Sequence, residues 1–305
     1  MPEFTIIMPC FNAAKTLNES IGSLLSQSIR DWELICIDDG STDETPKLLK
    51  GWEAADKRIK MLRNQGKGPS AARNMGAHYA TGNILCFCDA DDLWVPKKLE
   101  FLHREFKAER VDGLFGRVAF FRKRGKADTH SRMPSAPLSV PLLMGENPVC
   151  TTSNISIRRK TFLLSGGFDV NLVHNEDLEW LIRLVGGGAT IKGLDELHVW
   201  YRTSPQGLSS DLTAMSQSRQ KVLATARGFG FQPDRHAEAI YMRYLARRAL
   251  RLGHYGSSAI YLTFSGLRQS PRAFLFPLRS GLPTAVGAIC APLLPKSLRR
   301  SLFSR

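Results

Sequence analysis

The first hundred residues alternate short apolar runs with segments of helical spacing, and this alternation restricts the fold. Apolar, strand-like runs occupy residues 4–8, 32–37, 59–62 and 84–88. Helices are expected between them, for example over residues 45–55 and from Gly68-Pro69 onward. Strands that alternate with helices need right-handed crossovers, which make the strands parallel. The sequence therefore predicts an α/β fold with a mostly parallel sheet and flanking helices.

Two local signals mark helix ends in this region. Thr16 and Glu19 have the spacing of a capping box ahead of a helical pattern that begins at Leu17. Gly82 follows the segment opened by Pro69, where a glycine commonly takes the left-handed C-terminal position. We therefore expect one helix to start after Thr16 and another to end at Gly82.

Three polar motifs directly follow predicted strands. Pro9-Cys10-Phe11-Asn12 follows the first strand, Asp-Asp-Gly-Ser-Thr-Asp (residues 38–43) follows the second, and Asp89-Ala90-Asp91-Asp92 follows the fourth. Ligands of open α/β sheets bind at the carboxyl ends of the strands. We therefore expect the three motifs to meet in one site.

The carboxylates after the fourth strand point to a metal ion. Like charges this close raise one another's pKa and weaken the fold, and a divalent cation with oxygen ligands would offset the repulsion. The alternative is a solvated loop in which Asp92 caps the helix that follows.

Composition and charge place further limits on the chain. Its 305 residues are 43% hydrophobic, enough for a sizeable core. The net charge of +14 is uneven, because residues 205–305 hold 15 Lys and Arg against three acidic residues. None of the six cysteines has zinc-site spacing, and Cys86 and Cys88 share one face of a predicted strand. This cysteine usage indicates a reduced, cytosolic compartment. No signal-peptide pattern and no run of about 18 apolar residues is found, so a conventional membrane span is not expected.

Four motifs together carry a family resemblance. They are Ile7-Met8-Pro9-Cys10-Phe11-Asn12, the Asp-Asp-Gly-Ser-Thr-Asp run, Ala71-Ala72-Arg73-Asn74 and Asp89-Ala90-Asp91-Asp92. In order and spacing they resemble a family 2 glycosyltransferase of the GT-A fold over about residues 4–204. No Gly-x-Gly-x-x-Gly motif follows the first strand, which argues against a dinucleotide-binding Rossmann domain.

The resemblance implies roles for the first two motifs. Pro9, Phe11 and Asn12 would line the nucleotide base pocket, where Phe11 offers a flat apolar face for stacking. Asp39 would accept hydrogen bonds from the base or the ribose. Ordinary core packing is the alternative for Phe11, and a turn role is the alternative for Asp39.

Basic residues near the third helical segment are further nucleotide-sugar-binding candidates. Arg73 lies in the first turns of that helix, where the dipole favours anions, so a cation there needs a partner. A diphosphate or a carboxylate of the site would supply one. Lys67 is a second candidate, with a solvated loop lysine as the alternative.

The resemblance also divides the aspartate cluster by role. Asp89 would bind ribose or reach a metal through water, and Asp91 would ligate the metal directly. Mg²⁺ or Mn²⁺ suits all-oxygen ligation beside phosphate. The ion would neutralise charge on the departing nucleoside diphosphate.

The second half of this region is expected to supply the acceptor side. Residues 113–121 and 154–157 are predicted strands, and residues 166–169 (Gly-Gly-Phe-Asp) are a predicted tight turn. Residues 122–147 show no clear period, and we expect a mobile loop there.

An amphipathic helix then begins with Glu176 and Asp177, acids that the helix dipole alone would favour. The resemblance instead implies the Glu-Asp motif of inverting members. Asp177 would then be the general base for the acceptor hydroxyl, and Glu176 would lie on the acceptor side. Trp180 would stack on an acceptor sugar or else belong to the core. Arg202, in a Tyr-Arg element, would hold the diphosphate or else pair with a surface acid.

The last hundred residues differ in kind. Residues 236–253 predict a basic amphipathic helix, residues 257–267 a second helix, and residues 274–294 are apolar but interrupted by Arg279 and three prolines. Such a tail suits an anionic membrane surface. The alternative is a helical cap with a solvated basic face. Nucleic acid is not expected, because aromatic residues are not interleaved with the basic ones.

These expectations combine into one hypothesis. Residues 1–204 form a catalytic domain and residues 205–305 a basic helical region, peripheral on the inner face of the plasma membrane. The chain moves a sugar from a nucleoside-diphosphate sugar, with uridine as the favoured base, to a hydroxyl of a glycan or lipid-linked acceptor. The setting is bacterial exopolysaccharide or lipopolysaccharide assembly. A sugar-phosphate nucleotidyltransferase and a non-catalytic nucleotide-sugar-binding protein are the alternatives.

Overall fold

The computed structural model describes residues 1–123, 125–203, 211–253 and 257–303, which divide into two compact units. The first unit comprises Met1–Leu138 and Pro148–Thr203. The second comprises Ser139–Asn147 and the described part of Ser204–Arg305. Residues 139–147 therefore group with the C-terminal helices, although they lie within the range 1–204 that the sequence suggested as one domain.

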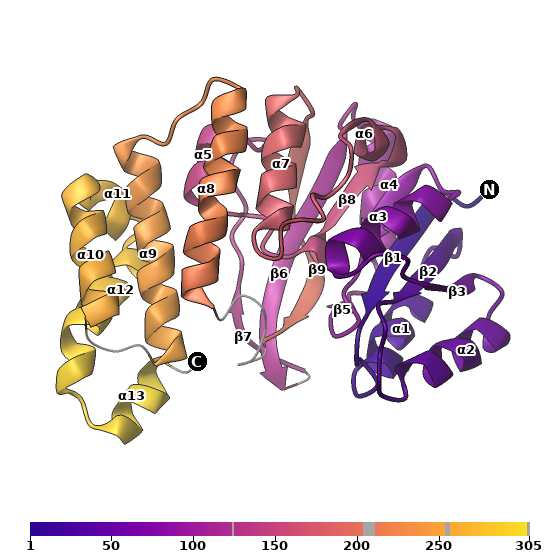
Figure 1. The fold of residues 1–305 in the computed structure, drawn as a ribbon, viewed down its shortest axis with the longest axis horizontal. Helices are drawn as coiled ribbons and strands as arrows, with labels where there is room; N and C mark the ends of the chain where they lie inside the picture. The colour runs from indigo at the N-terminus through magenta and orange to yellow at the C-terminus, as the bar shows by residue number, and fades with distance from the viewer. Residues whose placement is uncertain (124, 204–210, 254–256, 304–305) are drawn as a thin grey trace. The chain divides into compact units, whose positions relative to one another are not determined.

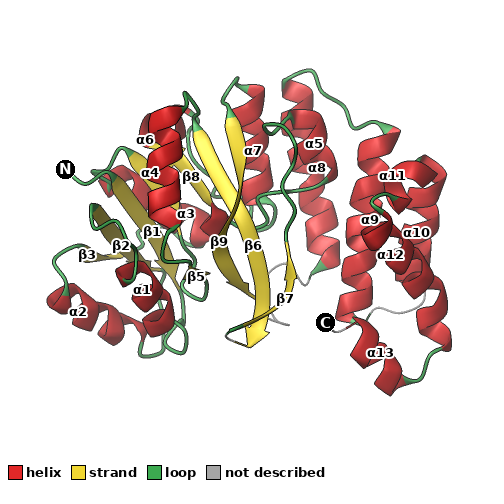
Figure 2. Ribbon diagram, turned by 180° about the vertical axis from the view of Figure 1, so that it is seen from behind, coloured by secondary structure: helices red, strands yellow, loops and turns green. Residues whose placement is uncertain are grey.

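The first unit is built on one mixed sheet of nine strands (Figures 1 and 2). The strand order is β3-β2-β1-β4-β8-β6-β9-β5, and β7 pairs with β6. β1 to β4 are mutually parallel, as are β6 and β9, whereas β8 is antiparallel to both β4 and β6. The bounds are β1 Phe4–Cys10, β2 Trp32–Asp38, β3 Ile59–Arg63, β4 Ile84–Phe87, β5 Leu93–Trp94, β6 Gly113–Lys123, β7 Lys126–His130, β8 Ile155–Arg158 and β9 Ile191–Arg202. The predicted α/β class is confirmed.

The alternation of side chains along the strands decides which helices cover each face. Ile6 and Met8 of β1 share a buried core with residues of α1 (Leu17–Leu25), α2 (Thr45–Ala55) and α4 (Lys98–Ala108). Cys86 and Cys88 lie in the same core, as the sequence predicted. Ile7 points the other way, toward α3 (Pro69–Tyr79), which approaches so closely that a Cβ at Gly76 would lie 2.5 Å from the Ile7 side chain. The remaining helices of this unit are η1 Thr152–Asn154, α6 Arg159–Leu164 and α7 Glu176–Gly186.

The capping box predicted at the start of α1 is not formed. The helix does begin at Leu17, but the Thr16 side chain caps no backbone N–H. Its hydroxyl donates instead to the carbonyl of Ala90 (2.9 Å). The Thr16 hydroxyl thus bonds to a residue 74 positions away instead of to the N-terminus of its own helix, and it connects α1 with the aspartate cluster.

The predicted role of Gly82 is also wrong. α3 ends at Tyr79, and Gly82 does not have a positive φ. A Cβ at Gly82 would lie 2.7 Å from the backbone carbonyl carbon of Phe4 and from the backbone nitrogen of Thr5. The glycine is thus needed for a close approach of two backbones and not for a helix end.

The loop predicted for residues 122–147 contains two regular elements. β6 continues to Lys123 and pairs antiparallel with β7, and Gly125 between them has a φ of +81°. A short helix, α5 (Val140–Gly145), follows, and its N-terminal cap Ser139 accepts a hydrogen bond from Leu142 N–H. β7 escaped prediction because its residues, Lys-Ala-Asp-Thr-His, alternate between exposed and half-buried and form no apolar pattern.

The second unit is helical. Beyond α5 it contains α8 Leu212–Gly228, α9 Arg235–Leu252, α10 Ser257–Gln269, α11 Pro271–Leu275, α12 Leu278–Cys290, η3 Ala291–Leu293 and α13 Lys296–Phe303. Helices over residues 236–253 and 257–267 are therefore confirmed. Two of the basic residues are internal: Arg243 donates to the carbonyl of Ala273 (2.9 Å), and the Arg219 guanidinium lies 3.7 Å from the centre of the Tyr241 ring. Part of the positive charge thus serves the fold of this unit.

Candidate active site

The three polar motifs meet at one edge of the sheet in the first unit. Cys10 at the end of β1 lies opposite Asp38 at the end of β2. Asp39 N–H donates to the Cys10 carbonyl (2.8 Å), and Cys88 N–H donates to the Ile7 carbonyl (3.0 Å). The carboxyl ends of β1, β2 and β4 are therefore adjacent, as the parallel order requires.

Phe11 and Asn12 form an exposed turn after β1, next to Pro9 at the strand end. The Phe11 side chain is 60% exposed, which excludes core packing. Asn12 has a left-handed φ of +48°, a conformation that its short polar side chain tolerates. Its side-chain carbonyl accepts a hydrogen bond from Thr42 N–H (2.8 Å). The turn is thereby fixed, with the aromatic ring of Phe11 in solvent.

Asp39 is held by the loop that opens α3. Its carboxylate accepts hydrogen bonds from Gly68 N–H (2.9 Å) and from the Asn64 side-chain amide (2.6 Å). Gly68 has a φ of +88°, which a residue with a Cβ rarely adopts. Lys67, the residue before it, is exposed. Asp39 thus orders the segment leading to Arg73, whereas the local turn bond, from Ser41 N–H, goes to the Asp38 carboxylate (3.2 Å).

Arg73 joins two carboxylates that lie far apart in the sequence. It donates from Nη2 to Asp89 Oδ1 (2.7 Å) and from Nη1 to Glu176 Oε1 (3.2 Å). Only 5% of its side chain is exposed, and its Nε makes no hydrogen bond in the described part of the chain. The sequence required an anionic partner for Arg73, and the structure supplies carboxylates of the site for this role.

The backbone and side chain of Asp89 are both anchored. Its N–H donates to the Ser153 hydroxyl (2.9 Å), and its carboxylate accepts a hydrogen bond from Arg73 Nη2 (2.7 Å). The neighbouring Asp91 is half-buried, and burial, followed by the charge of Asp89, raises the pKa of Asp91 to about 6. The two carboxylates therefore repel each other even though Asp89 is paired with Arg73.

Asp92 does not cap the following helix, since the N-terminal cap of α4 is Lys97. It is fully buried instead, and burial raises the pKa of its carboxyl well above the usual value. One oxygen accepts a hydrogen bond from Arg202 N–H (3.0 Å), while the other has no partner among the described residues. Asp92 thus fastens the aspartate loop to the end of β9.

The Arg202 side chain extends over the same loop. It donates to the Asp91 carbonyl (2.9 Å) and to Glu19 Oε2 (2.7 Å), and its guanidinium lies 4.8 Å from the centre of the Phe121 ring. The ion pair with Glu19 is the alternative that the sequence left open for Arg202. Glu19, expected to cap α1, is the acid involved.

Glu176 and Asp177 open α7 at the same edge. Asn175 before them has a φ of +57°, and Asp177 Oδ1 accepts a hydrogen bond from Leu178 N–H (2.8 Å). Burial, followed by the charge of Asp177, raises the pKa of Glu176 to about 7, although Arg73 acts in the opposite direction. The two acids therefore form a second group of crowded carboxylates, next to Arg73.

Trp180 cannot stack on a sugar in this structure, so its placement on the acceptor side is corrected. Its side chain is fully buried among Phe87, Phe162 and Phe168, with ring centroids 4.6 to 6.1 Å apart. Its indole N–H donates to the Ser165 hydroxyl (3.0 Å). The residue anchors α7 to the sheet, because a large amphipathic ring is most stable there with its polar atom satisfied.

Two residues that hold the Asp89 backbone in place were not predicted from the sequence. Ser153 accepts from Asp89 N–H, and Lys98 Nζ donates to the Ser153 carbonyl (2.7 Å) from a fully buried position. Burial lowers the pKa of Lys98 to about 8. The only sequence signal was the position of Lys98 within a helical pattern, which gives no indication of a partner 55 residues away.

The donor set around Asp91 is compatible with a magnesium or manganese ion. No group of three or more His, Cys, Asp or Glu side chains that could hold a metal ion is formed in residues 1–123, 125–203, 211–253 or 257–303. Mg²⁺, however, usually takes one or two carboxylates and completes its shell with phosphate and water. Such a cation would favour the ionised form of Asp91 and would so lower the pKa that burial and Asp89 raise.

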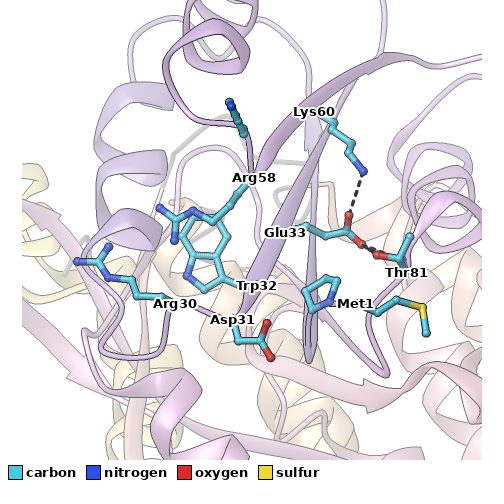
Figure 3. A pocket seen from close by; sticks show the side chains of 10 residues that line it. Met1, Arg30, Asp31, Trp32, Glu33, Arg58, Lys60 and Thr81 are labelled. Carbon is cyan, nitrogen blue, oxygen red and sulfur yellow. Dashed lines mark hydrogen bonds and ion pairs between the residues drawn. The ribbon is translucent and has the colours of Figure 1, made fainter.

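A separate hollow of about 430 Å³ lies at the opposite edge of the sheet (Figure 3). It is lined by residues at the amino ends of β2 and β3, among them Trp32, Glu33 and Lys60. Glu33 there accepts hydrogen bonds from Thr81 and Lys60, and the Arg58 guanidinium stacks 3.8 Å from the Trp32 ring centre. The charged side chains Glu33 and Lys60 are thus paired with each other, and none of the three polar motifs lines this hollow, so it is not the candidate site.

The comparisons with known proteins identify the family. The chain belongs to glycosyl transferase family 2, whose family model matches residues 5–163. It is therefore a glycosyltransferase. The motifs on which the resemblance rested all fall within the matched range.

Individual relatives agree with this assignment. The chain is 45% identical over 113 residues to the UDP-Glc:alpha-D-GlcNAc-diphosphoundecaprenol beta-1,3-glucosyltransferase WfgD of Escherichia coli, covering 37% of this chain and 44% of that protein. It is 29% identical over 213 residues to the putative teichuronic acid biosynthesis glycosyltransferase TuaG of Bacillus subtilis, covering 69% and 82%. The match to WfgD thus spans less than half of that relative's length.

A solved structure supports the GT-A fold. Residues 1–349 of Staphylococcus aureus TarS, in complex with UDP-GlcNAc, superpose with a TM-score of 0.63. The alignment covers 95% of this chain and 92% of that one at 17% identity. The mixed sheet with flanking helices therefore has the GT-A arrangement that the motifs predicted.

Proposed function

We propose that this glycosyltransferase moves a sugar from a UDP-sugar to a hydroxyl of a glycan or lipid-linked acceptor, with inversion at the anomeric carbon. The proposal rests on Arg73, which binds both Asp89 of the aspartate cluster and Glu176 at the start of α7. These two parts of the chain, assigned to the donor and to the acceptor, therefore lie in one site. UDP is favoured because the names of WfgD and of the TarS complex contain UDP-Glc and UDP-GlcNAc.

The donor nucleotide binds at the ends of β1 and β2. The exposed ring of Phe11 stacks on the base, with Pro9 and Asn12 beside it. Asp39, which keeps acceptor capacity beyond its bond from Gly68 N–H, accepts a hydrogen bond from the base or the ribose, and exposed Lys67 screens the phosphate charge. Arg202 contributes charge near the diphosphate when its pair with Glu19 opens.

Asp91, aided by Asp89, would hold the Mg²⁺ or Mn²⁺ ion. When bound, the ion supplies Lewis-acid stabilisation to the departing diphosphate. Arg73 keeps Asp89 oriented, and the Ser153 hydroxyl holds the Asp89 backbone in place. A preformed arrangement of this kind reduces the reorganisation required during transfer.

Asp177 acts as the general base. Its carboxylate takes the proton of the acceptor hydroxyl while that oxygen forms a bond to the anomeric carbon, and the bond from that carbon to the diphosphate oxygen breaks. UDP leaves with the bonding electron pair. One carboxylate suffices for this step, because the diphosphate is already a good leaving group. Glu176 stays paired with Arg73 and positions the start of α7.

The acceptor is a growing cell-envelope polymer in this proposal. The name of WfgD specifies a sugar on diphosphoundecaprenol, and that of TuaG specifies teichuronic acid biosynthesis. Both are compatible with a lipid-linked or envelope glycan acceptor. The enzyme would then work on the inner face of the plasma membrane, attached peripherally.

Product analysis tests this function. The purified chain is incubated with Mn²⁺, a panel of UDP-sugars and GDP-mannose, and a short-chain lipid diphosphate carrying GlcNAc. Release of UDP together with a product of inverted anomeric configuration, determined by NMR, is expected, as is loss of turnover with EDTA. Retained configuration or turnover in EDTA would contradict the mechanism. Pyrophosphate release would indicate a nucleotidyltransferase, and donor binding without release would indicate a non-catalytic protein.

A further inference from the structure

Helix α12 in the second unit exposes its large apolar side chains and buries its small ones. Its buried residues are small: Gly281, Thr284, Ala285, Gly287 and Ala288. Its large apolar residues are about half exposed, and we call the four of them the α12 stripe: Leu278, Leu282, Val286 and Ile289. Their spacing places them along one side of the helix. A surface helix in water normally has the opposite arrangement, with polar residues outward.

Neighbouring elements expose further large apolar residues. On α10, which lies beside α12 in both ribbon views, Tyr261 is 70% and Phe264 is 58% exposed (Figures 1 and 2). Leu293 after α12 is 84% exposed. On α13, Leu298 and Leu302 are also exposed, one helical turn apart. So many exposed large apolar residues within one small helical unit indicate an interaction surface.

The charge of the same region selects the kind of partner. From residue 239 to residue 305 the sequence has 11 Lys and Arg and no Asp or Glu. Arg268, Arg272 and Arg279 are exposed on α10, α11 and α12. A second copy of this chain would bring like charge to the contact, whereas an anionic lipid surface is complementary.

The length of α12 determines how it could meet a bilayer. In the described residues no helix is long and apolar enough to cross a membrane. The 13 residues of α12 extend over about 20 Å, less than the ~30 Å hydrocarbon core. A short helix with one apolar side and nearby cations lies in the interface plane. Tyr261 suits the headgroup level, where tyrosine is enriched.

We propose that the second unit docks on an anionic lipid bilayer, with the α12 stripe inserted between the headgroups and with Arg268, Arg272 and Arg279 on the phosphates. The inference deepens the proposed function, since a lipid-linked acceptor would be presented at this surface, but it rests on contacts of the second unit alone.

Vesicle co-sedimentation of the full chain tests the inference. We expect binding to phosphatidylcholine vesicles containing one third phosphatidylglycerol, weak binding to pure phosphatidylcholine, and loss of binding at high salt. Leu282→Ser/Val286→Ser is expected to lower the partition coefficient at least about tenfold. Leu163→Ser/Leu164→Ser removes exposed leucines of α6 in the first unit and is the matched control, with no expected change. Arg268→Gln/Arg272→Gln/Arg279→Gln is expected to cost about fivefold per charge and to reduce the salt dependence.

Thermal unfolding and UDP release from the donor are measured for every variant, so that misfolding and loss of catalysis are recognised separately. The inference is overturned if the folded chain ignores anionic vesicles, or if the Leu282/Val286 variant binds as well as the Leu163/Leu164 control. Dimerisation of the free chain that is abolished by Leu282→Ser/Val286→Ser would also overturn it, in favour of a second copy on the α12 stripe. None of these outcomes affects the assignment of the catalytic site.

Discussion

Arg73 Nη1 lies 3.2 Å from Glu176 Oε1, across 103 residues of sequence. The same guanidinium holds Asp89, so one buried cation connects the donor-side aspartates with the helix that carries Asp177. The helix dipole at the start of α3 disfavours a cation, and the two carboxylates offset this cost. The site is therefore held together by charge as well as by packing.

Replacing Arg73 by methionine should destabilise the first unit. Asp89 and Glu176 would be left without their cation in a poorly hydrated place, which typically lowers the free energy of unfolding by about 3 kcal/mol. Urea denaturation measures the effect. Lys47→Met is the control, because the Lys47–Glu44 pair is exposed and should contribute less than about 0.5 kcal/mol. Equal effects of the two substitutions would exclude a structural role for Arg73.

The raised pKa of Glu176, about 7, predicts a pH dependence of stability. Between its unfolded value of about 4.3 and the folded value, the folded state binds a proton that the unfolded state has released. The contribution of Glu176 to stability is thus complete at low pH and is lost as the pH rises through 7. Glu176→Gln should remove this loss. The free energy of unfolding of the variant, relative to that of the wild type, should therefore increase by up to about 3 kcal/mol from about pH 5 to about pH 8. Urea denaturation at several pH values measures this. A difference in unfolding free energy between variant and wild type that is the same at every pH would contradict the prediction.

Phe11→Ala should weaken nucleotide binding without affecting the fold. The ring is 60% exposed, so little buried area is lost, whereas stacking of a base on an aromatic ring contributes about 1–3 kcal/mol. We expect the Kd for UDP, measured by calorimetry, to rise at least about fivefold. Tyr79→Ala removes another exposed aromatic ring of the first unit and should change neither Kd nor Tm. If both variants bind UDP like the wild type, Phe11 does not contact the base.

Asp177→Asn should separate binding from catalysis. The amide cannot accept the proton of the acceptor hydroxyl, and loss of a general base typically lowers the rate by about 10²–10⁴-fold. Donor affinity, followed by thermal shift with UDP and Mn²⁺, should stay the same, since Asp177 is assigned to the acceptor. An unchanged kcat would rule out this residue as the base.

Gly82→Ala should be costly because of a backbone contact. The added Cβ would lie 2.7 Å from atoms of Phe4 and Thr5 that β1 holds in place, so we expect a loss of about 1–3 kcal/mol in unfolding free energy. Gly51→Ala is the matched substitution inside α2, where the added Cβ would meet no atom within 4 Å beyond the adjacent residues and nearby backbone of its own helix, and it should stabilise by about 0.5–1 kcal/mol. The opposite signs, read from thermal unfolding, test the packing of Gly82.

Local pattern was sufficient for much of the fold. The runs that became β1 to β4 were recognisable because burial on both faces of a parallel strand requires continuous apolar residues, and α2 appeared with its predicted bounds. β7 was missed because an exposed edge strand needs no apolar pattern. The capping box at Thr16 and the helix end at Gly82 were wrong because distant groups, Ala90 and β1, bind these residues instead.

The sequence by itself determined the class of the fold and the edge of the sheet where the motifs meet, since both follow from short-range periodicity and from the direction of parallel strands. Only the tertiary structure decided what each side chain touches: that Arg73 binds two carboxylates, that Trp180 is in the core, that Asp92 is buried, and that α12 has its large residues outward. The reason is physical. Periodicity records whether a position is buried, but the partner of a buried charge or ring is set by segments that meet only after the chain has folded.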